Sequence, residues 1–309
     1  VWKQRQKSEL IESILMGIPI PLMYLFEDKN GKKQVVDGRQ RISAILDFLE
    51  GKFKLNNLRI LKQFNGCCFA DLDLKQQGVI EDFQLLFYII QPPTPERVKY
   101  DIFDRVNRGG TPLNKQEMRN ALYRGRCTRM LDKLCCSPEF LIATGRSINK
   151  ERMKDQYVVL RAMAFLMLHR GEFKDIPALQ YRGDIDDFLA RFMVYVNDNA
   201  PEKLIVDYEN LFIRCMQISY DLLGENGFRF SGNGIRRPIN MPLFEALSYL
   251  FSFVPEKIDY TWVSRLILDI ESVKEEFDDS RYFSGNIDST TSVSFRFDRM
   301  DKIINRIQL

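Results

Sequence analysis

Val36-Asp37-Gly38-Arg39-Gln40-Arg41 is the stretch from which the fold of this 309-residue chain is read. It lies between a short apolar segment typical of a strand and a helical pattern that starts at Ile42. Backbone N–H groups at a helix N-terminus carry partial positive charge, and arginine side chains bind phosphate oxygens in pairs. The turn therefore indicates a phosphate-binding site, with an ordinary charged surface turn as the alternative.

The elements around this turn alternate between helix and strand. Towards the N-terminus we expect a helix over 8–16, a strand over 22–26 and, after the turn Asp28-Lys29-Asn30-Gly31, a second strand over 34–36. Towards the C-terminus the patterns predict a helix over 41–49, a strand over 53–55, a helix over 74–83, a buried strand over 85–90, and helices that begin at Thr94 and at Asn114.

Strand patterns fade after about residue 136. Helical periodicity then recurs over 154–168, 184–196, 201–223, 243–253 and 261–276, whereas 231–234 and 283–294 have loop-like composition. The sequence thus predicts an α+β protein with a domain over 1–136 and a mainly α-helical domain over 137–309.

The composition excludes several classes of protein. Lys and Arg number 45 against 42 Asp and Glu, so the net charge of +3 does not indicate a nucleic-acid binder, although a local basic stripe is compatible with it. The six cysteines form no C-x-x-C pair and predict reduced thiols in a cytoplasmic protein. No apolar run approaches the ~20 residues of a membrane span, and no signal peptide is visible. Because the chain opens at Val1-Trp2-Lys3 without Met, we expect an N-terminal piece to be missing.

Other enzyme signatures are absent from the sequence. The pairs Gly31-Lys32 and Gly51-Lys52 lack the earlier glycine of a P-loop. The chain has one histidine, His169, at the end of an apolar helix, where a core position or a C-terminal capping role is the simplest interpretation. A zinc site of the Cys/His type and an HNH-type nuclease site are therefore excluded.

A basic segment follows the predicted helix at Asn114. Its cations partly recur at helical spacing and could follow a phosphate backbone, whereas a solvated helix face is the alternative. We name Arg119, Arg126, Arg129 and Lys133 as candidate DNA-binding residues. Glu117, on the same segment, could hold a metal ion or an arginine.

Three motifs in order resemble one family. Asp37-Gly38-Arg39-Gln40-Arg41 with Ile42-Ser43-Ala44-Ile45 resembles the D-G-Q-Q-R-L-T-x-I signature of the family named for the N-terminal domain of GmrSD-type restriction enzymes, a ParB/sulfiredoxin-like domain. Phe103-Asp104-Arg105-Val106-Asn107-Arg108-Gly109-Gly110-Thr111-Pro112-Leu113 looks like its second signature, F-x-R-x-N-x-G-G-x-x-L. The opening from Trp2 to Pro21 resembles W-x-x-x-x-x-x-x-L-I-x-S-I-L-x-G-I-P-I-P. The three motifs cover about the first 125 residues.

The resemblance implies a ParB/sulfiredoxin-like domain with a small mixed sheet that binds and hydrolyses nucleotides, GTP or a broad range of NTPs, with Mg²⁺. It implies a bacterial system that restricts modified phage DNA and a nuclease domain or subunit as partner, since no HNH domain is present. The nucleotide would contact Asp37, Gly38, Arg39, Gln40, Arg41, Asn107, Gly109 and Gly110. Asp37, Arg41 and Glu117 are the catalytic candidates, with Mg²⁺ at Asp37 or Glu117.

Two departures from the family pattern bear on this hypothesis. Arg39 stands where the family has its first glutamine, which adds a cation to the turn. The P-x-Q-R element expected before Trp2 is absent from the sequence. A nucleotide- or DNA-sensing module without turnover is the first alternative, since no histidine is near the turn, and a self-contained nuclease is the second. Homo-oligomerisation stays open.

Overall fold

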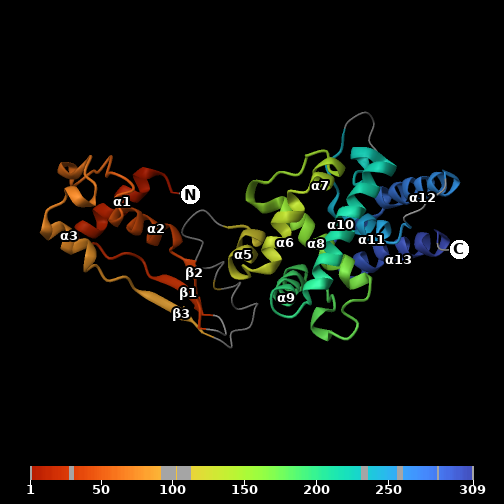
Figure 1. The fold of residues 1–309 in the computed structure, drawn as a ribbon, viewed down its shortest axis with the longest axis horizontal. Helices are drawn as coiled ribbons and strands as arrows, with labels where there is room; N and C mark the ends of the chain where they lie inside the picture. Colours follow the sequence, from red (N-terminus) through yellow and green to blue (C-terminus); the bar gives the residue numbers. More distant parts are fainter. Residues whose placement is uncertain are drawn as a thin grey trace. The chain divides into compact units, whose positions relative to one another are not determined.

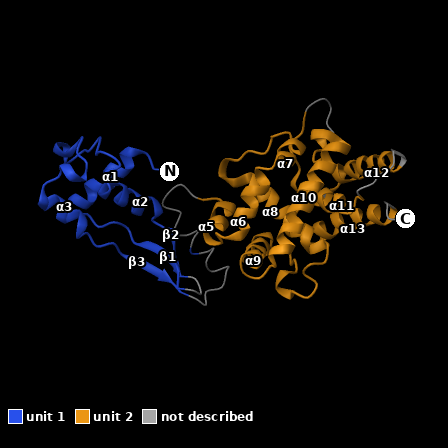
Figure 2. Cartoon of the chain, in the orientation of Figure 1, with its two compact units in different colours: residues 1–112 blue, residues 113–309 orange. Residues whose placement is uncertain are grey.

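The chain divides into two compact units, residues 1–112 and 113–309, each described by itself below (Figure 2). The computed structural model describes residues 2–27, 31–91, 102, 113–230, 236–255, 260–283 and 285–307. The division falls before the boundary that the sequence predicts at 136/137. The reason is that helix α6 (Arg126–Cys135) buries Cys127, Leu131 and Leu134 in unit 2, where it packs against α8 and α9.

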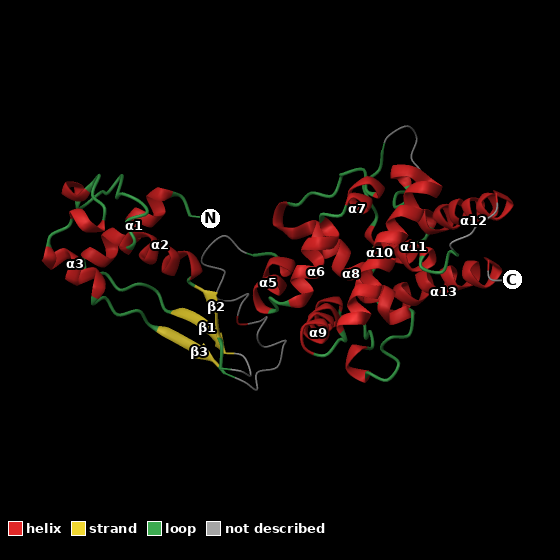
Figure 3. Ribbon diagram, in the orientation of Figure 1, coloured by secondary structure: helices red, strands yellow, loops and turns green. Residues whose placement is uncertain are grey.

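A three-stranded mixed sheet forms one part of unit 1 (Figure 3). Strands β1 (Met23–Glu27) and β2 (Lys33–Asp37) pair antiparallel, as the hairpin pattern predicts, and β3 (Phe87–Ile90) pairs parallel with β1 on the other side. The prediction that the third strand is buried was wrong. Of its four residues, Ile90 is buried and the other three are exposed, because β3 has β1 as its neighbour on one side and forms the edge of the described sheet.

Three helices accompany the sheet in unit 1: α1 (Gln4–Leu15), α2 (Arg39–Leu49) and α3 (Leu74–Glu81). Helix α1 packs against both others, and their apolar faces form one core that includes Ile11, Ile14 and Phe48. Helix α2 begins at Arg39, earlier than the sequence pattern predicts. Arg39 and Arg41 therefore lie in the first turn of a helix rather than in a loop before it.

The prediction of a strand over 53–55 was wrong, because this segment is a loop. Leu55 exchanges two backbone hydrogen bonds with the loop around Gly66: its N–H donates to Cys67 and its carbonyl accepts from Gly66. The pairing stops there, since Asn57 takes a left-handed conformation with φ 54°. The short 3₁₀ helices η1 (Lys62–Phe64) and η2 (Phe69–Asp71) follow.

The described residues of unit 2 form helices and the loops between them, and no strand (Figure 1). Its helices besides α6 are α5 (Lys115–Leu122), α7 (Pro138–Ala143), α8 (Lys154–His169), α9 (Ile185–Asp198), α10 (Glu202–Leu223), α11 (Met241–Phe251), α12 (Tyr260–Asp279) and α13 (Thr290–Ile307), with 3₁₀ turns η4 (Glu151–Met153), η5 (Pro177–Leu179), η6 (Gly224–Asn226) and η7 (Arg281–Phe283). The five helices predicted after residue 136 are present, and the α+β class is confirmed.

The loop predicted over 283–294 was partly wrong. Helix α13 begins at Thr290 and buries Val293, Phe297 and Met300 against its neighbours, α11 foremost among them. The serines and threonines at its start mask this apolar stripe in the sequence, because they are as typical of loops as of helix N-termini.

Candidate functional site: the N-terminus of helix α2

Gly38 joins β2 to α2 in a conformation that requires glycine. Its φ is 96°, in the left-handed region, and it occupies the N-cap position of α2. A Cβ at this position would lie 2.4 Å from Cγ and 2.5 Å from Sδ of Met23 on the neighbouring strand β1. A side chain at residue 38 would therefore need both a left-handed conformation and a displacement of the Met23 side chain.

No side chain among the described residues caps the N-terminus of α2. A glycine N-cap has no side chain to accept a hydrogen bond, and the first turn contains no acidic residue. The first helical bond runs from the N–H of Ile42 to the carbonyl of Gly38 at 2.9 Å. The N–H groups that precede it have no helical acceptor, which leaves a site of partial positive charge.

Arg41 is held in place from two sides. Its guanidinium forms an ion pair with Asp37, one turn earlier, and donates a hydrogen bond to the carbonyl of Pro21. The Arg41 side chain is 13% exposed, and the Asp37 side chain 26%. The cation is therefore oriented before any ligand arrives.

Arg39 and Gln40 are exposed. The Gln40 side-chain oxygen accepts a hydrogen bond from the backbone N–H of Trp2, which links α2 to the start of the chain. Arg39 has no hydrogen bond or ion pair among the described residues. Two arginines in the first turn oppose the helix dipole, so this arrangement is favourable when an anion is present.

Residues 1–124 match the model of the family described as GmrSD restriction endonuclease, N-terminal domain. This segment is therefore similar to the GmrSD N-terminal domain. The family is the one that the three sequence motifs resemble, and its name refers to a restriction system. No curated protein and no solved structure matches the chain.

The second sequence motif that resembles this family lies almost entirely outside the described residues. Asn107, Gly109 and Gly110 lie outside the described residues. Their predicted contacts with a nucleotide stay predictions.

Glu117 has a structural role at the start of α5. Its carboxylate accepts a hydrogen bond from the N–H of Asn114 at 2.7 Å and pairs with Arg152 at 3.1 Å. Asn114 in turn caps the helix, as the sequence predicts, by accepting from the N–H groups of Gln116 and Glu117. A catalytic or metal-binding role of Glu117 stays a prediction, and any ligand would compete with these bonds.

The predicted basic stripe divides into paired and unpaired cations. Arg119 is fully buried and pairs with Asp186 at 2.8 Å. Arg126 donates to the carbonyls of Val196 and Ala200 and pairs with Glu202, and Lys133 pairs with Glu209. Arg129 is exposed and has no partner among the described residues. DNA contact by these four residues stays a prediction, and it applies most directly to Arg129.

Other candidate chemistries find little support in the parts that the structure describes. No three His, Cys, Asp or Glu side chains there gather as metal ligands. None of the described helices combines the length and apolar character that crossing a membrane requires. His169 stacks on Phe297 with ring centroids 3.6 Å apart, and burial lowers its pKa to about 3, so it is a neutral core residue.

Sequence reasoning missed two contributors to the site. The carbonyl of Pro21 orients Arg41, and Met23 disfavours a side chain at residue 38. For Pro21 the signal was the Ile18-Pro19-Ile20-Pro21 segment, which is part of the opening family motif, and no sequence signal pointed to Met23.

Proposed function

We propose that this protein is the nucleotide-binding, NTP-hydrolysing component of a bacterial restriction system, and that the nucleotide phosphates bind at the N-terminus of α2. The observation that carries the proposal is the uncapped first turn of α2, in which Arg39 has no partner among the described residues and Arg41 is already oriented. A helix N-terminus with two arginines favours an anion with several oxygens, and a polyphosphate has them.

Each residue of the turn has a distinct part in this proposal. Gly38 lets the backbone approach the phosphates closely, and the N–H groups at the helix start donate to their oxygens. Arg41, fixed by Asp37 and Pro21, loses little side-chain freedom on binding. Arg39 is exposed, and it would become ordered when the ligand binds. Asn107, Gly109 and Gly110 would close the pocket, as the family resemblance implies.

Mg²⁺ fits the donor set of the turn. Mg²⁺ in nucleotide sites is commonly held by one or two carboxylates together with the phosphates, and Asp37 is a half-buried carboxylate beside the arginines. When bound, the ion would neutralise charge on the phosphates. The chain's own contribution to hydrolysis is to position the phosphates through Gly38 and Arg41, because phosphoryl transfer depends mainly on positioning and charge stabilisation.

A second function, nucleotide or DNA sensing without turnover, is favoured by one observation. Asp37 is already paired with Arg41, and His169 lies in the core of unit 2, so no free general base stands beside the turn among the described residues. In both functions a separate nuclease domain or subunit would cut DNA, and nucleotide binding would gate it. GTP is the first nucleotide to test, as the resemblance implies.

The test is binding and phosphate release for each of the four NTPs with Mg²⁺, with and without DNA. We expect wild-type protein to bind at least one NTP and Arg41→Ala to lose that binding. Lys75→Ala, an exposed cation on α3 of the same unit, is the matched control and keeps it. Binding without phosphate release would select the sensing module, and no binding of any NTP would refute both functions.

A further inference from the structure

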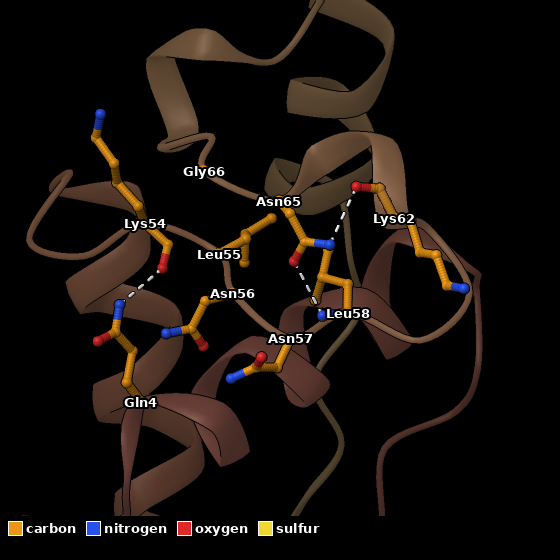
Figure 4. Close-up of a pocket in the computed structure, with 9 residues that line it drawn as sticks. All are labelled: Gln4, Lys54, Leu55, Asn56, Asn57, Leu58, Lys62, Asn65 and Gly66. Atoms are coloured by element: carbon orange, nitrogen blue, oxygen red, sulfur yellow. Dashed lines mark hydrogen bonds between the residues drawn. The ribbon is translucent and has the colours of Figure 1, made fainter.

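A pocket lies in unit 1, between the start of α1 and the loops on either side of η1 (Figure 4). Its volume is about 540 Å³, within the range of ligand-binding pockets, and it is open to solvent. None of its lining residues belongs to the turn at the start of α2. The lining residues are Gln4, Lys54, Leu55, Asn56, Asn57, Leu58, Lys62, Asn65 and Gly66.

The chemistry of this lining is cationic and amide-rich. Two lysines and four side-chain amides line the pocket, and no carboxylate does. The surrounding segment 51–69 contains four cations, Lys52, Lys54, Arg59 and Lys62, and no Asp or Glu. Lys52 pairs with Asp47 and Glu50, and Arg59 acts on the Glu12 carboxylate, so the positive charge available to an anion at the pocket comes from Lys54 and Lys62.

Several donors of the pocket are uncommitted. Lys54, Asn57 and Lys62 are exposed, and their side chains have no hydrogen bond or ion pair among the described residues. Asn57 holds a left-handed conformation, with φ 54°, which is uncommon outside glycine. In Figure 4 the two lysine side chains extend in opposite directions from the rim, and the amides of Asn56 and Asn57 lie between them.

The loop that carries these donors is fixed from behind, although it has little regular structure. The buried carboxylate of Glu12 accepts from the N–H groups of Ile60 and Leu61 at 2.9 and 2.8 Å, and the N–H of Arg59 lies 3.5 Å away. Burial alone raises the pKa of Glu12, but these backbone bonds and the charge of Arg59 outweigh it and lower the pKa below its ordinary value. The carboxylate is therefore ionised at neutral pH and anchors the loop.

Two more bonds fix the remaining backbone. The Ser8 hydroxyl accepts from the N–H of Asn56 at 3.1 Å, and the side-chain oxygen of Asn65 accepts from the N–H of Leu58 at 3.0 Å. A backbone held in this way presents its free side chains in a preformed arrangement, which lowers the entropy cost of binding.

We propose that this pocket binds the phosphodiester backbone of a nucleic-acid strand. Lysines on opposite sides of an open hollow can contact different phosphates of one strand, and side-chain amides can donate to phosphate and sugar oxygens between them. An open pocket suits a strand that enters and leaves it, whereas a free mononucleotide is usually enclosed on most sides. The site is separate from the turn at Gly38, so it does not depend on the proposed function.

The test is fluorescence anisotropy with a labelled single-stranded oligonucleotide and the full chain, over a series of salt concentrations. We expect the double variant Lys54→Ala/Lys62→Ala to bind several-fold more weakly. Its log–log salt slope should fall by about 1.4, because each phosphate contact on a single strand contributes about 0.7. Asn57→Gly should also weaken binding, and glycine tolerates the left-handed conformation, so its fold is retained.

Lys33→Ala/Lys75→Ala removes two exposed cations of the same unit outside the pocket and is the matched control. This control variant should bind the oligonucleotide with the affinity and the salt slope of the wild type. Equal affinity and slope for the wild type and the pocket double variant would overturn the proposal. The proposal would also be overturned if the oligonucleotide did not bind and a mononucleotide did, with a requirement for Lys54 and Lys62. That result would assign the pocket to a free nucleotide.

Discussion

Two buried arginines of unit 2 and the exposed Arg39 of unit 1 differ in how they are used. In unit 2, Arg161 and Arg296 are almost completely buried, and the carboxylate of Glu245 lies between them, with Arg296 Nη2 at 2.9 Å. Arg161 also pairs with Asp288 at 2.6 Å. In unit 1, Arg39 at the start of α2 is exposed and has no partner among the described residues.

This difference separates structural arginines from candidate ligand-binding ones. Arginines that are buried and ion-paired with carboxylates are not accessible to a ligand, and they fix how helices pack. An arginine without a partner at a helix N-terminus adds repulsion to the folded state unless an anion binds there. We therefore assign Arg39, beside the oriented Arg41, to ligand binding in unit 1.

The largest effect that we expect is at the buried network of unit 2. Glu245→Ala leaves Arg161 and Arg296 buried without their shared carboxylate, which should lower the free energy of unfolding by about 3–5 kcal/mol. Urea unfolding in a Trp2→Phe background follows unit 2, because Trp262 is then the single tryptophan.

Glu225→Ala is the control for this variant, since Glu225 pairs with Arg236 on the surface with its side chain 52% exposed. It should cost less than about 1 kcal/mol. Similar losses for the two variants would mean that burial does not distinguish the arginines as we argue.

The next effect is at Gly38. Gly38→Ala combines the strain of a left-handed residue, about 1–2 kcal/mol, with a clash against Met23. Gly51→Ala, after the other end of the same helix, carries a similar φ of 70° but meets no atom within 4 Å. We expect Gly38→Ala to destabilise unit 1 more than Gly51→Ala, measured by Trp2 fluorescence in a Trp262→Phe background. Equal losses of stability in the two variants would show that the contact between residue 38 and Met23 adds no cost.

A smaller effect concerns pH. The folded pKa of His169, about 3, lies below the ordinary value of about 6.5, so the unfolded chain takes up this proton first as pH falls. The free energy of unfolding should therefore fall between pH 6.5 and 4, and His169→Phe should make this fall shallower by up to about 1.4 kcal/mol per pH unit. Because the chain has one histidine, no second imidazole contributes. An unchanged pH profile would show that His169 is solvated.

The sequence predicted those features that depend on local patterns. The hairpin before Gly38, the cap at Asn114 and the long helices of unit 2 each follow from the spacing of apolar residues and from residues with fixed turn or cap chemistry. The burial of Arg119 and the exposure of β3 could not be predicted in this way, because they depend on partners distant in sequence, such as Asp186 for Arg119.

The same distinction applies to the candidate site. Its residue types and its place at a strand-to-helix turn were visible in the sequence. The orientation of Arg41 by the carbonyl of Pro21 and the exposure of Arg39 were not, because both follow from how β1 packs beside α2.

The central claim, that the unpaired arginine of unit 1 serves a ligand, is tested most directly at Arg39. We expect isothermal titration of GTP with Mg²⁺ into Arg39→Ala to show an affinity lower by about tenfold or more, since a charged hydrogen bond contributes about 1.5–3 kcal/mol. The melting temperature without ligand should stay at the wild-type value or rise slightly, because Arg39 has no partner among the described residues and its charge opposes the helix dipole. Wild-type affinity in Arg39→Ala, with Arg41→Ala as the reference for loss, would contradict the account.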